Sequence, residues 1–319
     1  MKKIELHLHL EGAAPPAFIK GLAAKKHQDV SGIFDARGNY SYRDFRHFLG
    51  VYETVTSLLT TPQDYANLLS EVLTAAGEQE TIYTELFLSP DFCGGGDLSA
   101  WRDYLGATEE VAHRFARDGV HSRGIATAIR HFDPAKSRKA ALCAAETAGG
   151  WLTGFGLAGA EQVGKAKDFA WAFDCAREAG LGLTAHAGEW GGPDSVRDVL
   201  DFGVTRIGHG ARAVEDKALL HDLAEREITL ECCAGSNIAL GLCPDWASHP
   251  IARLADAGVR VTVSTDDPPF FHTTLQNEYD RLADAFGWRE EDFRRLNHWA
   301  IDAAFCDEET RNRLRKELS

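Results

Sequence analysis

Eight short runs rich in apolar and β-branched residues recur along the 319-residue chain, and stretches with helical periodicity separate most of them. The runs cover residues 3–9, 82–88, 121–130, 151–157, 182–186, 206–209, 228–232 and 260–264. The helical stretches cover residues 100–117, 135–145, 163–179, 195–202, 216–225 and 250–257. Glycines near the ends of several helical stretches, such as Gly180 and Gly258, are typical of a helix-to-strand connection. Strands that alternate with helices pair in parallel, and eight such units predict a closed (β/α)₈ TIM-type barrel.

The pattern predicts a single barrel domain spanning residues 1–319, because an α/β barrel of this length forms one unit. The connection after the first run, residues 11–81, is so long that it needs structure of its own. Within it, Phe45, Phe48, Leu49 and Tyr52 have the spacing of an amphipathic helix. Such a helix could simply pack on the core, but we expect it to form an apolar lid over the carboxyl end of the barrel. Further helices, within residues 291–319, should pack outside.

The charge balance limits the partners of this chain. Its 34 basic and 48 acidic residues give a net charge of −14, which disfavours nucleic acid and anionic membranes. No apolar run is long enough to cross a membrane. The seven cysteines are scattered, which predicts free thiols and a cytoplasmic protein. We therefore expect a small-molecule partner, while the oligomeric state stays open.

Ionisable side chains lie at the carboxyl ends of several predicted strands, where barrel enzymes build their active sites. His7 and His9 share one face of the first strand, because strand residues alternate between faces. His186 ends the fifth strand, and Asp266 follows the eighth. We expect His7, His9, His186 and Asp266 to hold one first-row metal ion, with Zn²⁺ as the simplest candidate.

Each motif has an ordinary explanation when it is taken alone. His-x-His is common by chance, the Asp266-Asp267-Pro268 segment is more often a turn or a helix cap, and His209 between two glycines could be structural. Ionisable residues at four separate strand ends are much harder to explain as core. Their joint occurrence therefore favours the metal site.

The other ionisable groups suit a reaction in which a metal lowers the pKa of its bound water. His209 could accept the water's proton, Asp266 could hold the water's hydrogen, and Glu189 could act as a general acid if burial raises its pKa. Asp267 could accept a hydrogen bond from a substrate nitrogen. Gly159 could offer a backbone N–H at close range, because glycine lets the chain approach a ligand.

Five segments resemble, in order, the motifs of the adenosine deaminase family. They are His7-Leu8-His9-Leu10-Glu11-Gly12, Leu157-Ala158-Gly159, His186-Ala187-Gly188-Glu189, Arg206-Ile207-Gly208-His209-Gly210 and Thr265-Asp266-Asp267-Pro268. Tyr83-Thr84-Glu85-Leu86 and Ser236-Asn237 match as well, so the resemblance spans nearly the whole chain. It implies a (β/α)₈ zinc hydrolase of the amidohydrolase superfamily, which converts a 6-aminopurine to its 6-oxo form and releases ammonia.

By position, the resemblance implies a role for each candidate residue. It implies zinc binding by His7, His9, His186 and Asp266, protonation of purine N1 by Glu189, activation of water by His209 and Asp266, and substrate contacts by His9, Glu11, Gly159 and Asp267. Gly159 and Asp267 would contact the ring nitrogens N3 and N7. Glu11 stands where adenosine deaminases usually have an Asp that is expected to hold the ribose 5′-hydroxyl.

Departures from the family pattern concern the substrate. Glu11 also resembles adenine deaminases, Phe87 replaces a common Arg, and the 269–271 segment is bulkier than usual in nucleoside enzymes. Residues 189–193 and 207–210, by contrast, resemble the nucleoside enzymes, since adenine-type members tend to carry Asp before the histidine. We expect adenosine or deoxyadenosine as substrate. The alternatives are adenine, an N6-substituted adenine, or a 5′-modified adenosine such as aminodeoxyfutalosine.

Three other classes fit less well. Lactonases and phosphotriesterases on this barrel usually bridge two metals with a carboxylated lysine, and the predicted fourth and fifth strands contain no lysine. A binding protein with a relict barrel would be expected to lack a metal ligand or the proton donor, and all of these are present. The Cys-x-x-Cys signature of cytidine-type zinc deaminases is absent.

Overall fold

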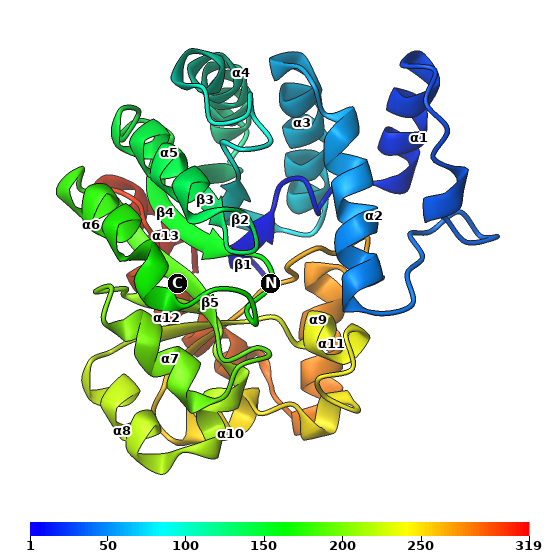
Figure 1. The fold of residues 1–319 in the computed structure, drawn as a ribbon. Coiled ribbons are helices and arrows are strands. Elements are labelled where there is room, and N and C mark those ends of the chain that lie inside the picture. The colour runs from blue at the N-terminus through cyan, green and yellow to red at the C-terminus, as the bar shows by residue number, and fades with distance from the viewer. Residues whose placement is uncertain (319) are drawn as a thin grey trace.

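The computed structural model describes residues 1–318 and contains eight parallel strands that pair in chain order (Figure 1). They are β1 (Lys3–His9), β2 (Thr81–Leu88), β3 (His121–Ile129), β4 (Leu152–Ala158), β5 (Gly182–Ala187), β6 (Arg206–His209), β7 (Thr229–Cys232) and β8 (Arg260–Val263). Backbone hydrogen bonds join the first strand to the residues after the last, because His9 N donates to Asp266 O at 3.0 Å and Asp266 N donates to His7 O at 3.1 Å. The predicted (β/α)₈ barrel is confirmed.

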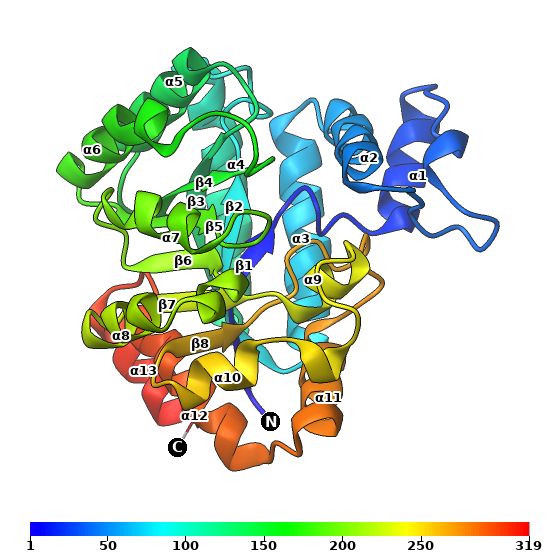
Figure 2. The same ribbon diagram turned by 60° about the horizontal axis from the view of Figure 1, so that its bottom comes forward.

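Helices surround the strands, as Figures 1 and 2 show. Those between β2 and β8 are α4 (Leu98–Arg117), α5 (Pro134–Ala145), α6 (Ala170–Glu178), α7 (Pro193–Leu200), α8 (Lys217–Glu225), α9 (Ala234–Ala239) and α10 (Ile251–Asp256). Short 3₁₀ turns precede some of them: η2 (Ala166–Phe169), η3 (Ala211–Glu215) and η4 (Trp246–Ser248). Asp97, Asp133 and Asp216 each accept a hydrogen bond from a backbone N–H in the first turn of a helix and so fix where it begins.

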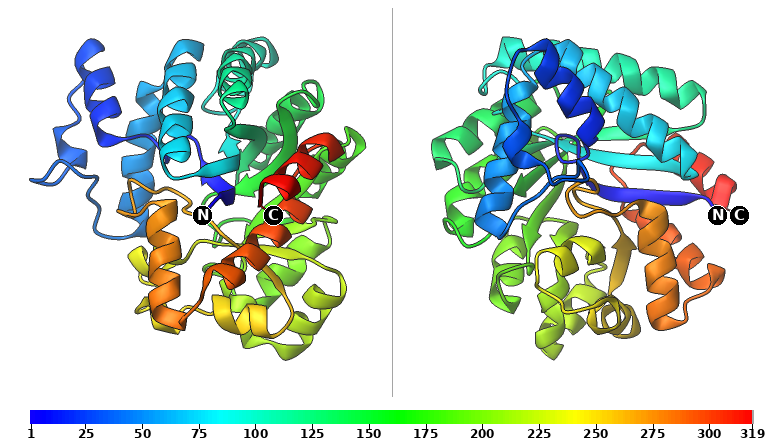
Figure 3. Two further views of the ribbon diagram at one scale, coloured as in Figure 1. Left: turned by 180° about the vertical axis from the view of Figure 1, so that it is seen from behind. Right: turned by 90° about the vertical axis from the view of Figure 1, so that its right-hand side faces the viewer.

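The long connection after β1 contains three helices rather than the one that the sequence predicted. They are α1 (Pro16–Lys25), α2 (Phe45–Leu58) and α3 (Pro62–Glu78), with η1 (Ser31–Ile33) between the first two. The predicted helix is α2, whereas α3 packs against α4 and β2 as an outer helix of the barrel. In Figure 3, α1 and α2 lie toward one end of the barrel, and both chain ends lie toward the other.

Three helices follow β8: α11 (Leu275–Phe286), α12 (Glu290–Ala303) and α13 (Glu308–Leu318). As predicted, α12 packs outside, against β8 and β1. The link between α12 and α13, however, brings the Phe305 ring into the amino-terminal end of the barrel. A Cβ atom added to Gly182 would lie 2.3 Å from this ring, and the Arg206 guanidinium lies 3.7 Å from its centroid. Phe305 therefore packs against β5 and Arg206 at that end of the barrel.

No helix within residues 1–318 is long and apolar enough to cross a lipid bilayer.

Candidate active site and metal centre

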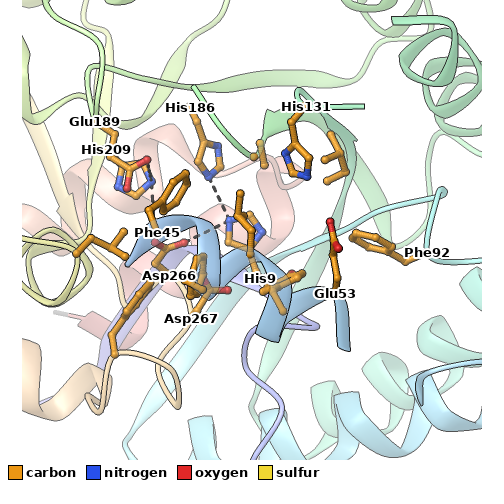
Figure 4. Close-up of a pocket in the computed structure, with 18 residues that line it drawn as sticks. His9, Phe45, Glu53, Phe92, His131, His186, Glu189, His209, Asp266 and Asp267 are labelled. Atoms are coloured by element: carbon orange, nitrogen blue, oxygen red, sulfur yellow. Dashed lines mark hydrogen bonds and ion pairs between the residues drawn. The ribbon is translucent and has the colours of Figure 1, made fainter. Parts of the chain in front are cut away.

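Three imidazoles and a carboxylate meet at the carboxyl end of the barrel. Figure 4 shows two of the imidazoles, His9 and His186, together with Asp266. His7 and His9 come from β1, His186 from β5 and Asp266 from the segment after β8. His9 Nε2 lies 3.1 Å from His186 Nε2 and 3.3 Å from Asp266 Oδ1, and His7 Nε2 lies 3.5 Å from the same oxygen. Ligands at the usual zinc distances in a tetrahedral site lie about 3.3 Å apart. The spacing of these four donors thus fits one such ion.

The hydrogen bonds of this cluster also point to a cation. His7 Nε2 is buried, and within residues 1–318 it has no hydrogen-bond partner. A buried polar nitrogen without a partner is costly, and a bound cation would satisfy it. Asp266 Oδ2 accepts a 2.7 Å hydrogen bond from Ser236 Oγ on α9, so the carboxylate is held while its other oxygen faces the imidazoles.

A buried carboxylate holds His7 from behind. Glu231 Oε2 lies 2.6 Å from His7 Nδ1, and Oε1 accepts from Thr184 Oγ1 at 3.0 Å and from Arg206 Nε at 2.6 Å. Burial alone would raise the pKa of Glu231, but Arg206 and His7 outweigh burial and hold this pKa below its usual value. A carboxylate in this position fixes the tautomer and the ring orientation of a metal-binding histidine.

Glu189 and His209 lie beside the cluster, and burial shifts their pKa values in opposite directions. His209 Nε2 lies 3.8 Å from Glu189 Oε2 and 4.0 Å from Asp266 Oδ2. Burial lowers the pKa of His209 to about 4, although the Asp266 charge opposes this shift. Burial, followed by the charges of Asp266 and Glu161, raises the pKa of Glu189 well above its usual value. At neutral pH the site therefore presents a neutral imidazole beside a carboxyl group that holds its proton more strongly than usual, and the two can serve as base and acid.

Two of the site residues have a strained backbone. His209 and Asp266 have φ values of +62° and +67°, in the left-handed region that non-glycine residues rarely adopt. Such residues cost about 1–3 kcal/mol each and tend to gather at functional sites. Gly208, next to His209, has a packing reason of its own, because an added Cβ would lie 2.8 Å from His7 Cε1. Glycine at position 208 therefore leaves room for the His7 ring.

An aromatic roof covers the pocket. Phe45, Phe48, Leu49 and Tyr52 of α2 line it as the sequence predicted, so the position of this helix over the barrel mouth is confirmed. The residues that line the rest of the pocket are His9, Glu53, Phe92, Ile129, His131, Ala158, Gly159, His186, Glu189, His209, Leu240, Asp266, Asp267 and Phe271. Figure 4 shows Glu189 and His209 at one end of the pocket and Phe92 and Glu53 at the other.

Gly159 and Asp267 both line this pocket. Gly159 has a φ of +96°, and a Cβ there would lie 2.6 Å from His131 Nδ1, so only glycine fits without movement. Burial, together with the charges of Asp266, Glu11 and Glu189, raises the pKa of Asp267 well above its usual value. The Asp267 carboxyl group therefore holds a proton more strongly than usual, and in its protonated form it can donate a hydrogen bond as well as accept one.

Glu11 does not line the pocket. Its side chain lies beneath α2 and α3, where Tyr65 Oη donates to Oε1 at 3.0 Å and Tyr52 Oη donates to Oε2 at 3.4 Å. Ser89 N also donates to Oε1, at 3.3 Å. Only 2% of Glu11 is exposed, and both of its oxygens are occupied by the protein. Among the predicted substrate contacts, Glu11 alone is therefore turned away from the cavity.

The bulky departures from the family pattern have structural roles. Phe87 stacks on His9 with ring centroids 4.9 Å apart, so it supports a candidate ligand. Phe270 stacks on Tyr40 at 4.1 Å, and Phe271 stacks on Phe48 of α2 at 5.4 Å. These contacts anchor the roof to the segment that carries Asp266 and Asp267.

Sequence reasoning missed the roles of several residues that organise the site, including Glu161 and Glu231, and it matched Ser236 to the family pattern without giving it a role. Gly12 is another, because an added Cβ would lie 1.5 Å from Asp267 Oδ1. The glycine of the His7–Gly12 motif was a readable signal for a close backbone approach at that point. Glu161 and Glu231 act through partners far away in the sequence and gave no local signal.

Comparison with known proteins agrees with this geometry. A family model described as adenosine deaminase matches residues 2–319. An adenine deaminase from Rhizobium leguminosarum is 48% identical over 319 residues, which cover 100% of this chain and 99% of that protein. The crystal structure of an adenine deaminase from Arthrobacter aurescens has a TM-score of 0.90 at 25% identity and covers 98% of this chain and 97% of its own. A zinc-bound amidohydrolase from Burkholderia ambifaria has a TM-score of 0.87 at 25% identity, with coverages of 100% and 89%. The chain belongs to the adenosine deaminase family, the hydrolytic deaminases of the amidohydrolase superfamily.

Proposed function

We propose that this protein is a zinc-dependent adenine deaminase, which converts adenine and water to hypoxanthine and ammonia. The observation that carries the proposal is the position of Glu11. In adenosine deaminases an acidic residue at this place is expected to hold the ribose 5′-hydroxyl, whereas here Tyr65, Tyr52 and Ser89 already occupy the carboxylate. A nucleoside would lose that partner, while a free base does not need it.

The similarity to proteins named adenine deaminases supports the same choice over adenosine, the substrate that we expected from the sequence. The aromatic roof supports it as well, because Phe45, Phe48 and Phe271 offer flat apolar surfaces to a planar base. The glycine at position 208 resembles the nucleoside enzymes and favours adenosine, although it also packs closely against His7.

We propose one Zn²⁺ ion, held by His7, His9, His186 and Asp266. When bound, zinc lowers the pKa of a coordinated water molecule toward neutrality and makes a nucleophile available. The spacing of the four donors and the unpartnered His7 Nε2 support this assignment.

The residues around this centre would divide the proton transfers of the reaction. His209, neutral at pH 7 because burial lowers its pKa to about 4, would accept the proton from the attacking water. Glu189, whose pKa burial raises well above its usual value, would donate its proton to purine N1 and make C6 more electrophilic. Protonated Asp267 would donate to N7, and Gly159 N–H would donate to N3. The aromatic roof would exclude bulk water while these contacts form.

A substrate panel with ammonia release as readout tests the proposal. Adenine, N6-methyladenine, adenosine and deoxyadenosine are compared by kcat/KM, and bound zinc is measured by elemental analysis. We expect adenine to be preferred over adenosine by more than about 100-fold, since the nucleoside loses a polar partner and must fit a sugar under the roof. One zinc per chain is expected.

The Glu189→Gln variant, purified in the same way, is the control, because turnover by a contaminating deaminase would survive in it. Equal kcat/KM values for adenosine and adenine would rule out the free base as the preferred substrate. A preference for N6-methyladenine would assign the protein to N6-substituted bases instead.

A further inference from the structure

The buried carboxylate of Glu161 accepts hydrogen bonds from the backbone of the loop that carries Glu189. Glu161, just after β4, accepts hydrogen bonds from four consecutive backbone N–H groups. Gly188 N donates to Oε1 at 2.7 Å, and Glu189 N, Trp190 N and Gly191 N donate to Oε2 at 3.1, 2.6 and 2.8 Å. Ser195 Oγ, at the start of α7, donates to Oε1 at 2.5 Å. One side chain thus determines the path of residues 188–191.

The chemistry of this contact favours a fixed loop. Glu161 is only 5% exposed, and hydrogen bonds to a buried carboxylate are roughly twice as strong as bonds between neutral groups. Successive backbone N–H groups that turn toward one point form an anion-binding nest. Here the anion is part of the protein. Gly188 adopts a left-handed φ of +68°, which lets the chain make this turn.

Glu161 itself cannot be a reacting group. It does not line the pocket, and both of its oxygens are occupied by the loop and by Ser195. Its contact with the chemistry is Glu189, whose backbone N–H it holds and whose side chain reaches the pocket. A proton donor must be held within about 0.5 Å of its productive position, so the support beneath it matters.

We propose that Glu161 is a positioning residue: it fixes the 188–191 backbone so that the Glu189 carboxyl group faces the ring nitrogen that it protonates. This proposal rests on the acid role of Glu189 given above. It adds a residue to the machinery that neither touches the substrate nor binds the metal.

The Glu161→Gln variant tests the proposal. The amide keeps the size of the side chain, but its NH₂ group faces N–H donors and cannot accept their hydrogen bonds. We expect kcat to fall by about 10- to 100-fold, as for a catalytic group displaced by up to about 1 Å. The KM should change less than about threefold, and one zinc per chain should remain, because the metal ligands lie elsewhere.

A double-mutant cycle with Glu189→Gln separates positioning from a general structural role. If Glu161 acts through Glu189, then adding Glu161→Gln to Glu189→Gln should change kcat less than about twofold, measured in single turnovers with excess enzyme. Equal fold-losses in both backgrounds would overturn the proposal. So would a Glu161→Gln enzyme with the wild-type kcat per bound zinc.

Two further variants keep the test decisive. Gly191→Ala would place a Cβ 2.6 Å from Glu161 Oε1 and so disturb the same contact from the loop side. If Glu161→Gln does not fold, the cycle is run with Gly191→Ala, and the same non-additivity is expected. Asp64→Asn is the matched control. Asp64 accepts from Thr60 N, Thr61 N and Lys26 Nζ at the start of α3, so its loss should lower the melting temperature but leave kcat unchanged.

Failure of the proposed function is recognised separately in this design. If the wild-type protein prefers another 6-aminopurine to adenine, the cycle is run with that substrate. The coupling between Glu161 and Glu189 is then judged on its own.

Discussion

The Glu231→Gln variant tests whether the buried carboxylate behind His7 sets the affinity for the metal. Glu231 contacts His7 Nδ1 at 2.6 Å and fixes which ring nitrogen faces the centre. An amide of the same size can still receive the proton of Nδ1, but it lacks the charge that makes His7 a stronger ligand. Loss of such a supporting carboxylate typically weakens metal binding about 10- to 100-fold, or about 1.4–2.7 kcal/mol.

The same substitution also removes one charge from a buried ion pair. Arg206 Nε contacts Glu231 Oε1 at 2.6 Å, and Arg206 Nη1 contacts Glu85 Oε2 at 2.6 Å. Breaking a buried pair usually costs about 3–5 kcal/mol of stability. Arg206 would keep Glu85, so we expect a loss toward the lower end of that range.

The Glu85→Gln variant is the matched control, because it removes the other carboxylate of Arg206 without touching His7. Zinc affinity is measured by competition with a chromophoric chelator, and melting temperatures are measured with and without zinc. Both variants should melt earlier than the wild type, but only Glu231→Gln should lose zinc affinity. The reasoning fails if Glu231→Gln binds zinc within twofold of the wild type, or if both variants weaken binding equally.

Three other predictions follow from the site and its surroundings. Glu189→Gln should keep its zinc, measured by elemental analysis, and lose about 10²- to 10⁴-fold in kcat, measured by ammonia release, because the ring loses its proton donor. Near-normal turnover would contradict the assignment. His186→Ala should lower the metal content, and full zinc occupancy with unchanged rates would remove it from the ligand set. Burial raises the pKa of Glu278, on α11, from 4.5 to about 8. The folded state therefore keeps this proton while the unfolded state releases it, so stability should fall as the pH rises from about 5 to about 8. Glu278→Gln should flatten this fall in melting temperature, and an unchanged pH dependence would contradict the assignment.

The strands and the convergence of His7, His9, His186 and Asp266 could be predicted because their signals are local and repeated. Each predicted run agrees with an observed strand to within one residue at either end. His7 and His9 alternate correctly on β1, and the carboxyl ends of parallel strands necessarily meet at one rim. The start of α3 was also readable in principle, since Thr61 and Asp64 form a capping box around Pro62. The apolar spacing of α2 is the stronger signal in this connection, and it carries no information about a second helix.

The direction of a side chain at the end of a strand could not be predicted. Glu11 follows β1 directly, and its sequence position fits a substrate contact. Instead, Tyr65 of α3, 54 residues later, donates a hydrogen bond to the carboxylate. Glu231 meets His7 across 224 residues, and Glu161 meets the Glu189 N–H across 28. Periodicity gives no information about such pairs, because they depend on which helices cover which strand ends.

The aromatic ring of Phe305 has a consequence for how substrate and products enter and leave the enzyme. The ring packs against the fully buried Arg206 at the end of the barrel remote from the candidate metal ligands. Since these two side chains lie together at that end, we expect both products of the proposed reaction to leave by the mouth through which the substrate enters, beneath α2.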